Sequence, residues 1–273
     1  MNPFQGAVAL VTGGASGIGR ALCEELGRRG AVVAVADLNA DGAAAVAAAI
    51  TTAGGKASPA GLDVRRPDDV ERVYSEAAAA HGRLDYVFNN AGLSTLGEVR
   101  DLDLAHWRKV VDVNLLGVIH GVHTAYRIMT AQGAGHIVNT ASLGGLVGFP
   151  TAIPYATTKY AVVGLSLSLR AEGAALGVKV SVVCPGFIRT GIFEASDYVR
   201  SDKETAVSMI PVKMIEPAAA ARTILDGVAK NRAVIVFPFY ARLLWWIERF
   251  FPRLTQRLHR QTVADFRKRR RQG

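Results

Sequence analysis

The most constraining feature of this sequence is a regular alternation between short β-branched apolar runs and longer alanine-rich stretches. Seven runs are predicted strands: 8–12, 32–37, 56–63, 84–89, 135–142, 178–185 and 233–237. Most are continuously apolar, which is typical of strands covered on both faces. The stretches between them are predicted helices: 18–29, 41–53, 67–81, 102–131, 155–176 and 217–230.

Seven strand–helix units in series predict an α/β fold of the Rossmann type. We expect a doubly wound parallel sheet of seven strands with helices on both faces. No break in composition divides residues 1–237, so we interpret them as one dinucleotide-binding catalytic domain, followed by a separate tail over residues 238–273.

The charge of the chain is concentrated in that tail. The whole chain carries 32 Lys+Arg against 23 Asp+Glu, a net charge of +9, but ten basic and only two acidic residues lie in 238–273. Residues 1–237 are therefore close to neutral, at +1, and the tail carries +8. Half of the residues are hydrophobic, which excludes an intrinsically disordered chain. The near-neutral body, which also lacks a recognition motif, argues against nucleic acid as a partner.

Nothing in the sequence predicts export or a membrane span. The N-terminus has no basic region, and the longest uncharged stretch, 128–158, is rich in glycine and hydroxyl side chains. The two cysteines, Cys23 and Cys184, are too few for a disulfide framework, and we interpret Cys184 as a buried packing residue. We expect a reduced, cytoplasmic location. The six histidines show no metal-binding spacing, so no metal is expected.

A glycine-rich turn follows the first predicted strand, with the spacing Gly13-x-x-x-Gly17-x-Gly19 and a predicted helix directly after it. Glycine allows a tight turn and lets backbone N–H groups approach a pyrophosphate at a helix N-terminus. Ser16 and Ile18 lie in the same turn. The turn alone is a weak signal, but its place between a strand and a helix indicates a dinucleotide site.

An acidic residue, Asp37, ends the second predicted strand. A carboxylate here can accept hydrogen bonds from the adenosine ribose, and it would repel a 2′-phosphate. Neither Ser16 nor Leu38 supplies the positive charge that a 2′-phosphate needs. We therefore expect NAD, with NADP as the less favoured cofactor. The simpler alternative is a solvated residue at a strand end.

Tyr155 and Lys159 lie four residues apart in a predicted helix, so their side chains share one face. A tyrosine pKa is ordinarily about 10, and a neighbouring ammonium group favours the phenolate and lowers that pKa. Tyr155 is therefore the candidate general acid/base, and Lys159 the residue that tunes it. Ser142 ends the fifth predicted strand and can hydrogen-bond a substrate oxygen. Each feature is common by itself; their combination indicates a catalytic site.

Taken together, these motifs resemble the short-chain dehydrogenase/reductase family, in its branch of single-domain NAD(P)-dependent oxidoreductases. The resemblance rests on Thr12-Gly-x-x-x-Gly-x-Gly19, Asn89-Asn90-Ala91-Gly92, Ser142, Tyr155-x-x-x-Lys159 and Pro185-Gly186, and it covers roughly residues 4–237. It implies hydride transfer between the nicotinamide and a secondary alcohol or ketone, or an alcohol/aldehyde pair.

The resemblance also implies roles for individual residues. Lys159 would bind the nicotinamide ribose, and Asn114 would hold a water molecule in a proton relay. The implied and predicted cofactor-binding residues are Gly13, Ser16, Gly17, Ile18, Gly19, Asp37, Asp63, Val64, Asn90, Ala91, Gly92, Tyr155, Lys159, Pro185, Gly186, Ile188 and Thr190. A homo-oligomer, dimer or tetramer, through the helices at 102–131 and 155–176 is implied as well.

Apolar residues near the catalytic candidates predict an apolar substrate pocket. The candidates for its lining are Leu143, Leu146, Val147, Phe149, Ile153 and Phe187, under a lid over 191–214 that carries Phe193, Tyr198, Met209, Ile210 and Met214. These side chains either pack on one another or cover a large substrate such as a steroid, retinoid or fatty alcohol. A second class of function, a dinucleotide-binding sensor or scaffold, has no need of Ser142, Tyr155, Lys159 and Asn114 together.

The tail is predicted to form a basic amphipathic helix. On a helical wheel one apolar arc holds Tyr240, Leu243, Leu244, Ile247, Phe250, Phe251, Leu254 and Leu258, and another face holds Arg242, Arg249, Arg253, Arg257 and Arg260. Pro252 is expected to kink or divide the helix. Such a helix suits peripheral contact with an anionic membrane, to which the basic run 267–271 would add. It suits packing on the body or on a partner subunit equally well.

Overall fold

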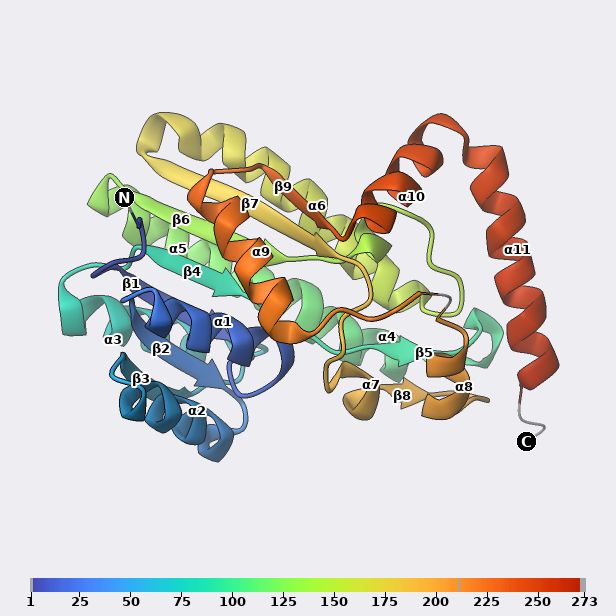
Figure 1. Ribbon diagram of the computed structural model, residues 1–273, viewed down its shortest axis with the longest axis horizontal. Coiled ribbons are helices and arrows are strands. Elements are labelled where there is room, and N and C mark those ends of the chain that lie inside the picture. Colours follow the sequence, from blue (N-terminus) through green and yellow to red (C-terminus); the bar gives the residue numbers. More distant parts are fainter. Residues whose placement is uncertain (1, 211, 271–273) are drawn as a thin grey trace.

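Seven parallel strands form one sheet, in the order β3-β2-β1-β4-β6-β7-β9 (Figure 1). The computed structural model describes residues 2–210 and 212–270. The strands are β1 (Val8–Thr12), β2 (Val32–Asp37), β3 (Lys56–Gly61), β4 (Tyr86–Asn89), β6 (Gly135–Thr140), β7 (Val178–Pro185) and β9 (Val234–Phe237). The chain runs outward from β1 to β3 and returns to β4 on the other side of β1. This order confirms the predicted doubly wound sheet, whose ligand crevice lies where the strand order reverses.

Helices cover both faces of the sheet and create two apolar cores. The helices α1 (Gly17–Arg28), α2 (Ala40–Thr52) and α9 (Pro217–Ala229) cover one face, and α3 (Pro67–His81), α5 (Gly117–Gln132) and α6 (Ile153–Gly173) cover the other. Successive residues of β1 enter opposite cores: Leu10 packs with the α3–α5–α6 side and Val11 with the α1–α9 side. A strand buried on both faces must be apolar throughout, which explains the unbroken run at 8–12.

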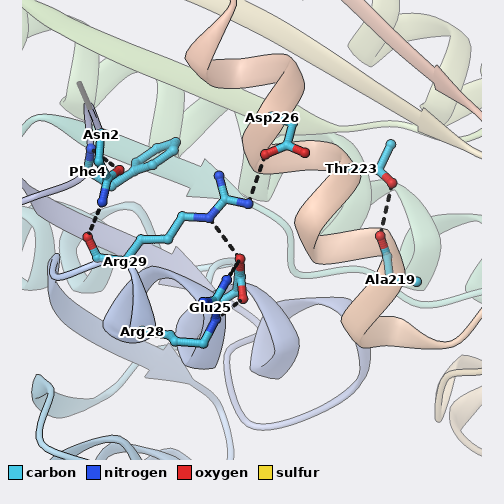
Figure 2. A network of polar contacts seen from close by, with 8 residues as sticks. All are labelled: Asn2, Phe4, Glu25, Arg28, Arg29, Ala219, Thr223 and Asp226. Carbon is cyan, nitrogen blue, oxygen red and sulfur yellow. Dashed lines mark hydrogen bonds and ion pairs between the residues drawn. The ribbon is translucent and has the colours of Figure 1, made fainter.

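An ion-pair network joins α1 to α9 at the end of the sheet away from the crevice (Figure 2). Arg29, directly after α1, contacts Glu25 at 2.8 Å and Asp226 of α9 at 2.8 Å. The Arg29 guanidinium also lies 5.6 Å from the centre of the Phe4 ring. Hydrogen bonds from Arg28 and Arg29 hold the pKa of the Glu25 carboxyl below the usual value, although burial of this side chain acts in the opposite direction. These contacts tie the N-terminal segment and two helices into one unit.

The predicted helix over 102–131 is present over residues 104–132, but it is not α-helical throughout. It forms α4 (Leu104–Val111), one turn of π-helix, η2 (Asp112–Leu116), and then α5. A π turn carries an additional residue, and such turns are frequent at functional sites. The 3₁₀ turns are η1 (Val99–Asp101), η3 (Leu143–Gly145) and η4 (Ala174–Leu176). The edge strand β3 also ends earlier than predicted, before Asp63.

The segment predicted as a lid is partly structured. It contains α7 (Ile192–Ala195), β8 (Asp197–Tyr198) and α8 (Lys203–Ser208). β8 pairs in parallel with β5 (Thr95–Leu96) in a separate two-stranded sheet. Lys109 of α4 reinforces this pairing through an ion pair with Asp197 at 2.7 Å. The lid is therefore fixed to the segment after β4.

The tail forms two helices, α10 (Phe239–Phe250) and α11 (Pro252–Arg269), which meet at Phe251 (Figure 1). The division at Pro252 agrees with the prediction. The inner side of α10 packs on the α6-side core through Tyr240, Ala241, Leu244 and Trp245. Part of the predicted apolar arc is therefore buried by the body itself.

The end of α11 returns to the body. Arg267 contacts Glu98 at 2.7 Å, Arg270 pairs with Asp101, and Arg269 donates to Ser208 at 2.8 Å. Phe266 is buried beside these contacts. Since Glu98 and Asp101 follow β5 and Ser208 ends α8, α11 joins two segments of the lid region.

Candidate active site

A cavity of about 570 Å³ lies at the carboxyl ends of the strands, and almost every sequence-predicted site residue lines it. The predicted residues in its wall are Gly13, Ser16, Gly17, Ile18, Asp37, Asp63, Val64, Asn90, Ala91, Gly92, Ser142, Tyr155, Lys159, Pro185, Gly186, Ile188 and Thr190. Gly19 and Asn114 are not part of the wall. Gly19 packs behind the glycine-rich turn, where a Cβ would lie 2.0 Å from the Gly13 carbonyl oxygen.

The glycine-rich turn owes its shape to left-handed backbone and close packing. Gly13 has φ +67° and Gly17 has φ +53°, a conformation that side chains with a Cβ rarely adopt. A Cβ on Gly13 would also lie 2.9 Å from the Cα of Ala91. The turn is thus pressed against the Asn90–Gly92 segment and leaves its cavity side free of side chains. Such a surface admits a pyrophosphate group.

The Thr12 hydroxyl joins these two segments, a role that sequence reasoning missed. Its oxygen accepts hydrogen bonds from the backbone N–H groups of Asn90 at 3.0 Å and Ala91 at 3.1 Å. The Asn90 side chain in turn donates to the Thr12 carbonyl oxygen at 3.1 Å. The threonine stands at the head of the motif, but its partners come from another strand.

Asp37 lies at the end of β2 with its carboxylate beside the glycine-rich turn. One oxygen accepts from the N–H of Ala15 at 3.0 Å and the other from the N–H of Asn39 at 2.9 Å. The neighbouring Leu38 is largely exposed and also lines the cavity. Arg65, a cation in this part of the wall, is held by Asp63 at 2.6 Å. This corner of the cavity is therefore negative rather than positive.

Ser142, Tyr155 and Lys159 lie together in the wall of the cavity. Ser142 follows β6 and accepts from the N–H of Gly144, whereas Tyr155 and Lys159 lie one turn apart on α6. The Lys159 ammonium lies 5.5 Å from the centre of the Tyr155 ring and donates to the Thr140 carbonyl oxygen at 2.8 Å. Cys184 is buried nearby with its pKa raised to about 12 by burial, as suits a packing residue.

The pKa values at this site correct one expectation. Burial raises the pKa of Tyr155, and the Ser142 hydroxyl offsets only part of that rise. The expected lowering by Lys159 does not prevail, because burial also lowers the pKa of Lys159, to about 8. Burial thus works against the charged form of both side chains.

Asn114 occupies the π turn and is fully buried behind the cavity. Its side chain accepts from the N–H of Leu93 at 2.9 Å and donates to the Leu93 carbonyl oxygen at 2.8 Å. A Cβ placed on Gly92 would lie 3.3 Å from the Asn114 oxygen and 3.5 Å from the Lys159 nitrogen. Asn114 and Lys159 therefore border the same small space beside Gly92.

The loop after β7 closes the cavity opposite the glycine-rich turn. The Thr190 side chain lies 3.1 Å from the position that a Cβ on Gly17 would take. The Tyr240 hydroxyl of α10 accepts from the N–H of Phe187 at 2.7 Å. A residue of the tail thereby holds the loop that Pro185, Gly186 and Ile188 form.

The predicted substrate end is partly correct. Leu143, Phe149, Phe187 and Phe193 line the cavity, and the Phe149 and Phe187 rings lie 6.0 Å apart. Leu146, Val147 and Ile153 do not line it, nor do Tyr198, Met209, Ile210 and Met214. Sequence reasoning missed further lining residues: Leu93, Ser94, Leu96, Lys109, Val113, Ala152, Ile192, Ala195 and Ser196. Leu96 belongs to β5, and the others lie beside β5 and β8, on α4, η2 and α7, or just before α6. They come from separate short segments, which leave no readable pattern in the sequence.

The residues of this cavity fit a dinucleotide. A Cβ at Gly13, Gly17 or Gly19 would contact neighbouring atoms too closely, so the turn must stay free of side chains there. The carboxylate of Asp37 lies at the end of β2. Within residues 2–210 and 212–270, no three His, Cys, Asp or Glu side chains are grouped to hold a metal ion.

Comparison with known proteins agrees with a dinucleotide-binding enzyme. Residues 7–199 match the short chain dehydrogenase family. A cyclohexanol dehydrogenase of Acinetobacter sp. (strain SE19) is 37% identical over 205 residues, which are 73% of this chain and 81% of that protein. The putative oxidoreductase SadH of Mycobacterium tuberculosis is 34% identical over an alignment that covers 97% of this chain and 98% of that protein. A crystal structure of a short-chain dehydrogenase/reductase from Burkholderia phymatum in complex with NAD has a TM-score of 0.86 at 29% identity, covering 93% of this chain and 97% of that one. This chain belongs to the short-chain dehydrogenase/reductase family.

Proposed function

We propose that the protein is an NAD-dependent oxidoreductase that interconverts an apolar secondary alcohol and its ketone. The observation that carries the proposal is the meeting of Ser142, Tyr155 and Lys159 in the wall of one cavity with the glycine-rich turn and Asp37. Bound NAD would accept or supply the hydride. It would be held by Gly13, Ser16, Gly17, Ile18, Asp37, Asp63, Val64, Asn90, Ala91, Gly92, Tyr155, Lys159, Pro185, Gly186, Ile188 and Thr190, with Gly19 supporting the turn from behind.

In this proposal the side chains orient the substrate and move one proton. The Ser142 and Tyr155 hydroxyls hydrogen-bond the substrate oxygen and place its carbon toward the cofactor. Tyr155 donates its proton in reduction and accepts one in alcohol oxidation. Lys159 and Asn114 border the space beside Gly92, through which a water molecule would return the proton to solvent.

The Tyr155→Phe variant tests this mechanism. We expect a loss of at least about 100-fold in kcat/KM, since general acid/base catalysis contributes 10² to 10⁴. The measurement is NADH formation with a panel of secondary alcohols. Tyr160→Phe is the matched control, because Tyr160 lies on the same helix with its side chain partly exposed. Equal turnover in Tyr155→Phe and the wild type would overturn the mechanism.

The preference for NAD over NADP is tested by substitutions at the end of β2. In the Asp37→Ser/Leu38→Arg variant the 2′-phosphate of NADP would lie beside an arginine and no longer beside a carboxylate. We expect the ratio of kcat/KM for NAD to that for NADP to fall by about 100-fold or more, which corresponds to two charge-assisted contacts. A wild type that prefers NADP would contradict the assignment of Asp37.

The apolar lining supports an apolar substrate, and the relative named a cyclohexanol dehydrogenase favours an alicyclic alcohol over an open-chain one. Steroids, retinoids and fatty alcohols belong in the same screen as cyclohexanol. The alternative, a dinucleotide-binding sensor or scaffold, predicts NAD binding without turnover of any of these alcohols.

The proposal extends to assembly and location. Leu116 and Ile119 around η2 and α5, and Leu167 of α6, expose large apolar side chains, which supports a dimer or tetramer through these helices. No helix among the described residues is long and apolar enough to cross a membrane. We place the enzyme in the cytoplasm, with peripheral contact to an anionic membrane through the tail 238–273.

A further inference from the structure

The junction between α10 and α11 exposes large apolar side chains and projects from the body (Figure 1). We call this surface the elbow; it consists of Leu243, Trp246, Phe250, Phe251, Leu254 and Leu258, each about half exposed or more. Trp246, Phe250 and Phe251 are 60%, 57% and 65% exposed, and the Trp246 and Phe250 rings stack with centroids 5.3 Å apart. A folded chain that keeps aromatic rings in water at its most projecting point has a surface suited to binding.

Four arginines on the two helices that form the elbow have no acidic partner within the described part of the chain. Arg249, Arg253, Arg257 and Arg260 are exposed, and none forms an ion pair within the described part of the chain. The tail has two acidic residues. Glu248 is half-buried, and burial together with the charge of Glu248 raises the pKa of Tyr160 of α6. Asp265 pairs with Lys268 at 3.2 Å. The elbow therefore lies on the same two helices as four exposed arginines that have no acidic partner among the described residues.

The last basic residues of the chain behave differently. Arg267, Arg269 and Arg270 contact Glu98, Ser208 and Asp101 of the body. Arg267 and Arg270 are paired with acidic side chains, so they do not supply the free positive charge that the sequence led us to expect of the run 267–271, of which residue 271 lies outside the described part. Arg269 donates to a hydroxyl group and keeps its charge. Two sets of arginines in one tail thus have separate roles.

We propose that the elbow is a docking surface for an anionic lipid bilayer. Tryptophan and phenylalanine partition to the membrane–water interface, where the flanking arginines meet lipid phosphates. A second copy of this chain fits less well, because two elbows would bring eight unpaired arginines together. This inference deepens the location part of the proposed function and is independent of its catalytic part, because vesicle binding is measured without substrate.

The test uses the full-length protein in vesicle flotation. Vesicles of phosphatidylcholine alone are compared with vesicles holding about 30% phosphatidylglycerol, at about 0.1 M salt where surface charges still act. We expect binding to the anionic vesicles only. Arg249→Gln/Arg253→Gln should weaken it by about tenfold or more. Trp246→Ser/Phe250→Ser/Phe251→Ser should remove the apolar part and reduce binding at least as much.

A matched pair of substitutions in the body distinguishes the contribution of the elbow to vesicle binding from that of the net charge of the protein. Arg66→Gln/Arg222→Gln removes two exposed charges from the body, and we expect vesicle binding within about twofold of the wild type. All variants should retain alcohol dehydrogenase activity, since no altered residue lines the cavity. Equal loss of binding in both arginine pairs would overturn the proposal. So would a fall in oligomeric mass of the triple serine variant, by light scattering, with vesicle binding unchanged.

Discussion

Lys159 holds an ammonium group at a site that is 3% exposed, where its pKa is lowered to about 8. The unfolded chain has the ordinary value of 10.5, so below about pH 8 the buried charge lowers the stability of the fold by a constant amount. Between about pH 8 and 10.5 the unfolded chain binds more protons, and stability rises with pH.

The Lys159→Met variant should therefore be inactive but more stable than the wild type at pH 7. We expect a gain of about 1–2 kcal/mol, after about 1 kcal/mol is lost with the hydrogen bond to Thr140. The gain should disappear, and reverse, by about pH 10.5, where the wild-type amine is neutral. Thermal unfolding at both pH values measures this. Lys56→Met, which removes an exposed lysine at a strand end, is the matched control.

At this scale the sequence predicts what depends on residue type and local spacing. The glycine-rich turn, Asp37 and the Tyr155–Lys159 pair can be recognised because their chemistry needs those residues at those intervals. The Thr12 hydroxyl and the raised pKa of Tyr155 could not be, because they depend on neighbours from other elements and on burial. Both become visible only after the strands are assembled.

At the scale of elements, strands and helices were predictable where each buries a whole apolar face. The π turn between α4 and α5 was not, because the apolar pattern continues through it. The β5–β8 pairing was not either, since two residues carry no periodicity. Both features shape the substrate end, which is why that end is where prediction was least accurate.

The contact between the end of α11 and η1 is testable at the same scale. We call it the clamp; it is the ion pair of Arg270 with Asp101. The Asp101 and Arg270 side chains are 10% and 27% exposed, so their ion pair is largely shielded from solvent. A double-mutant cycle with Asp101→Ala and Arg270→Ala should give a coupling energy above about 1 kcal/mol by denaturant unfolding. The exposed pair Asp265–Lys268 should give about 0.5 kcal/mol or less. Equal couplings would contradict a structural role for the clamp.

At the scale of the whole molecule, the tail has two parts: the inner side of α10 belongs to the core of the body, and the rest of the tail lies outside it. Its charge of +8 set it apart in the sequence, yet its return to Glu98 joins residues 169 positions apart. Such a contact cannot be read from composition. The functional division into a catalytic body, 1–237, and a tail remains our proposal, with α10 serving both.

Two truncations distinguish these parts. A chain ending at residue 251 keeps α10 but loses the buried Phe266 and the pairs of Arg267 and Arg270 with Glu98 and Asp101, so it should lose about 1–2 kcal/mol. A chain ending at 237 loses Tyr240, Ala241, Leu244 and Trp245 from the core. We expect a loss of at least about 3 kcal/mol and a Tm lower by about 10 °C in calorimetry. It should also bind NAD more weakly, because Tyr240 no longer holds the N–H of Phe187. Identical unfolding of the two truncated chains would show that α10 contributes nothing to the body.

The π turn over Asp112–Leu116 also limits how this chain can change in length. Removing one residue there would let the chain close into regular α-helix, while the helical segments on either side keep their phase. Val118, Val122, Ala125 and Met129 would still face the core. Such a deletion should therefore spare the fold but displace the Asn114 side chain from the backbone of Leu93. A one-residue deletion within α5 itself would instead rotate its two parts by about 100° relative to each other. Related sequences that keep Asn114 in its place should therefore keep all five residues of the turn.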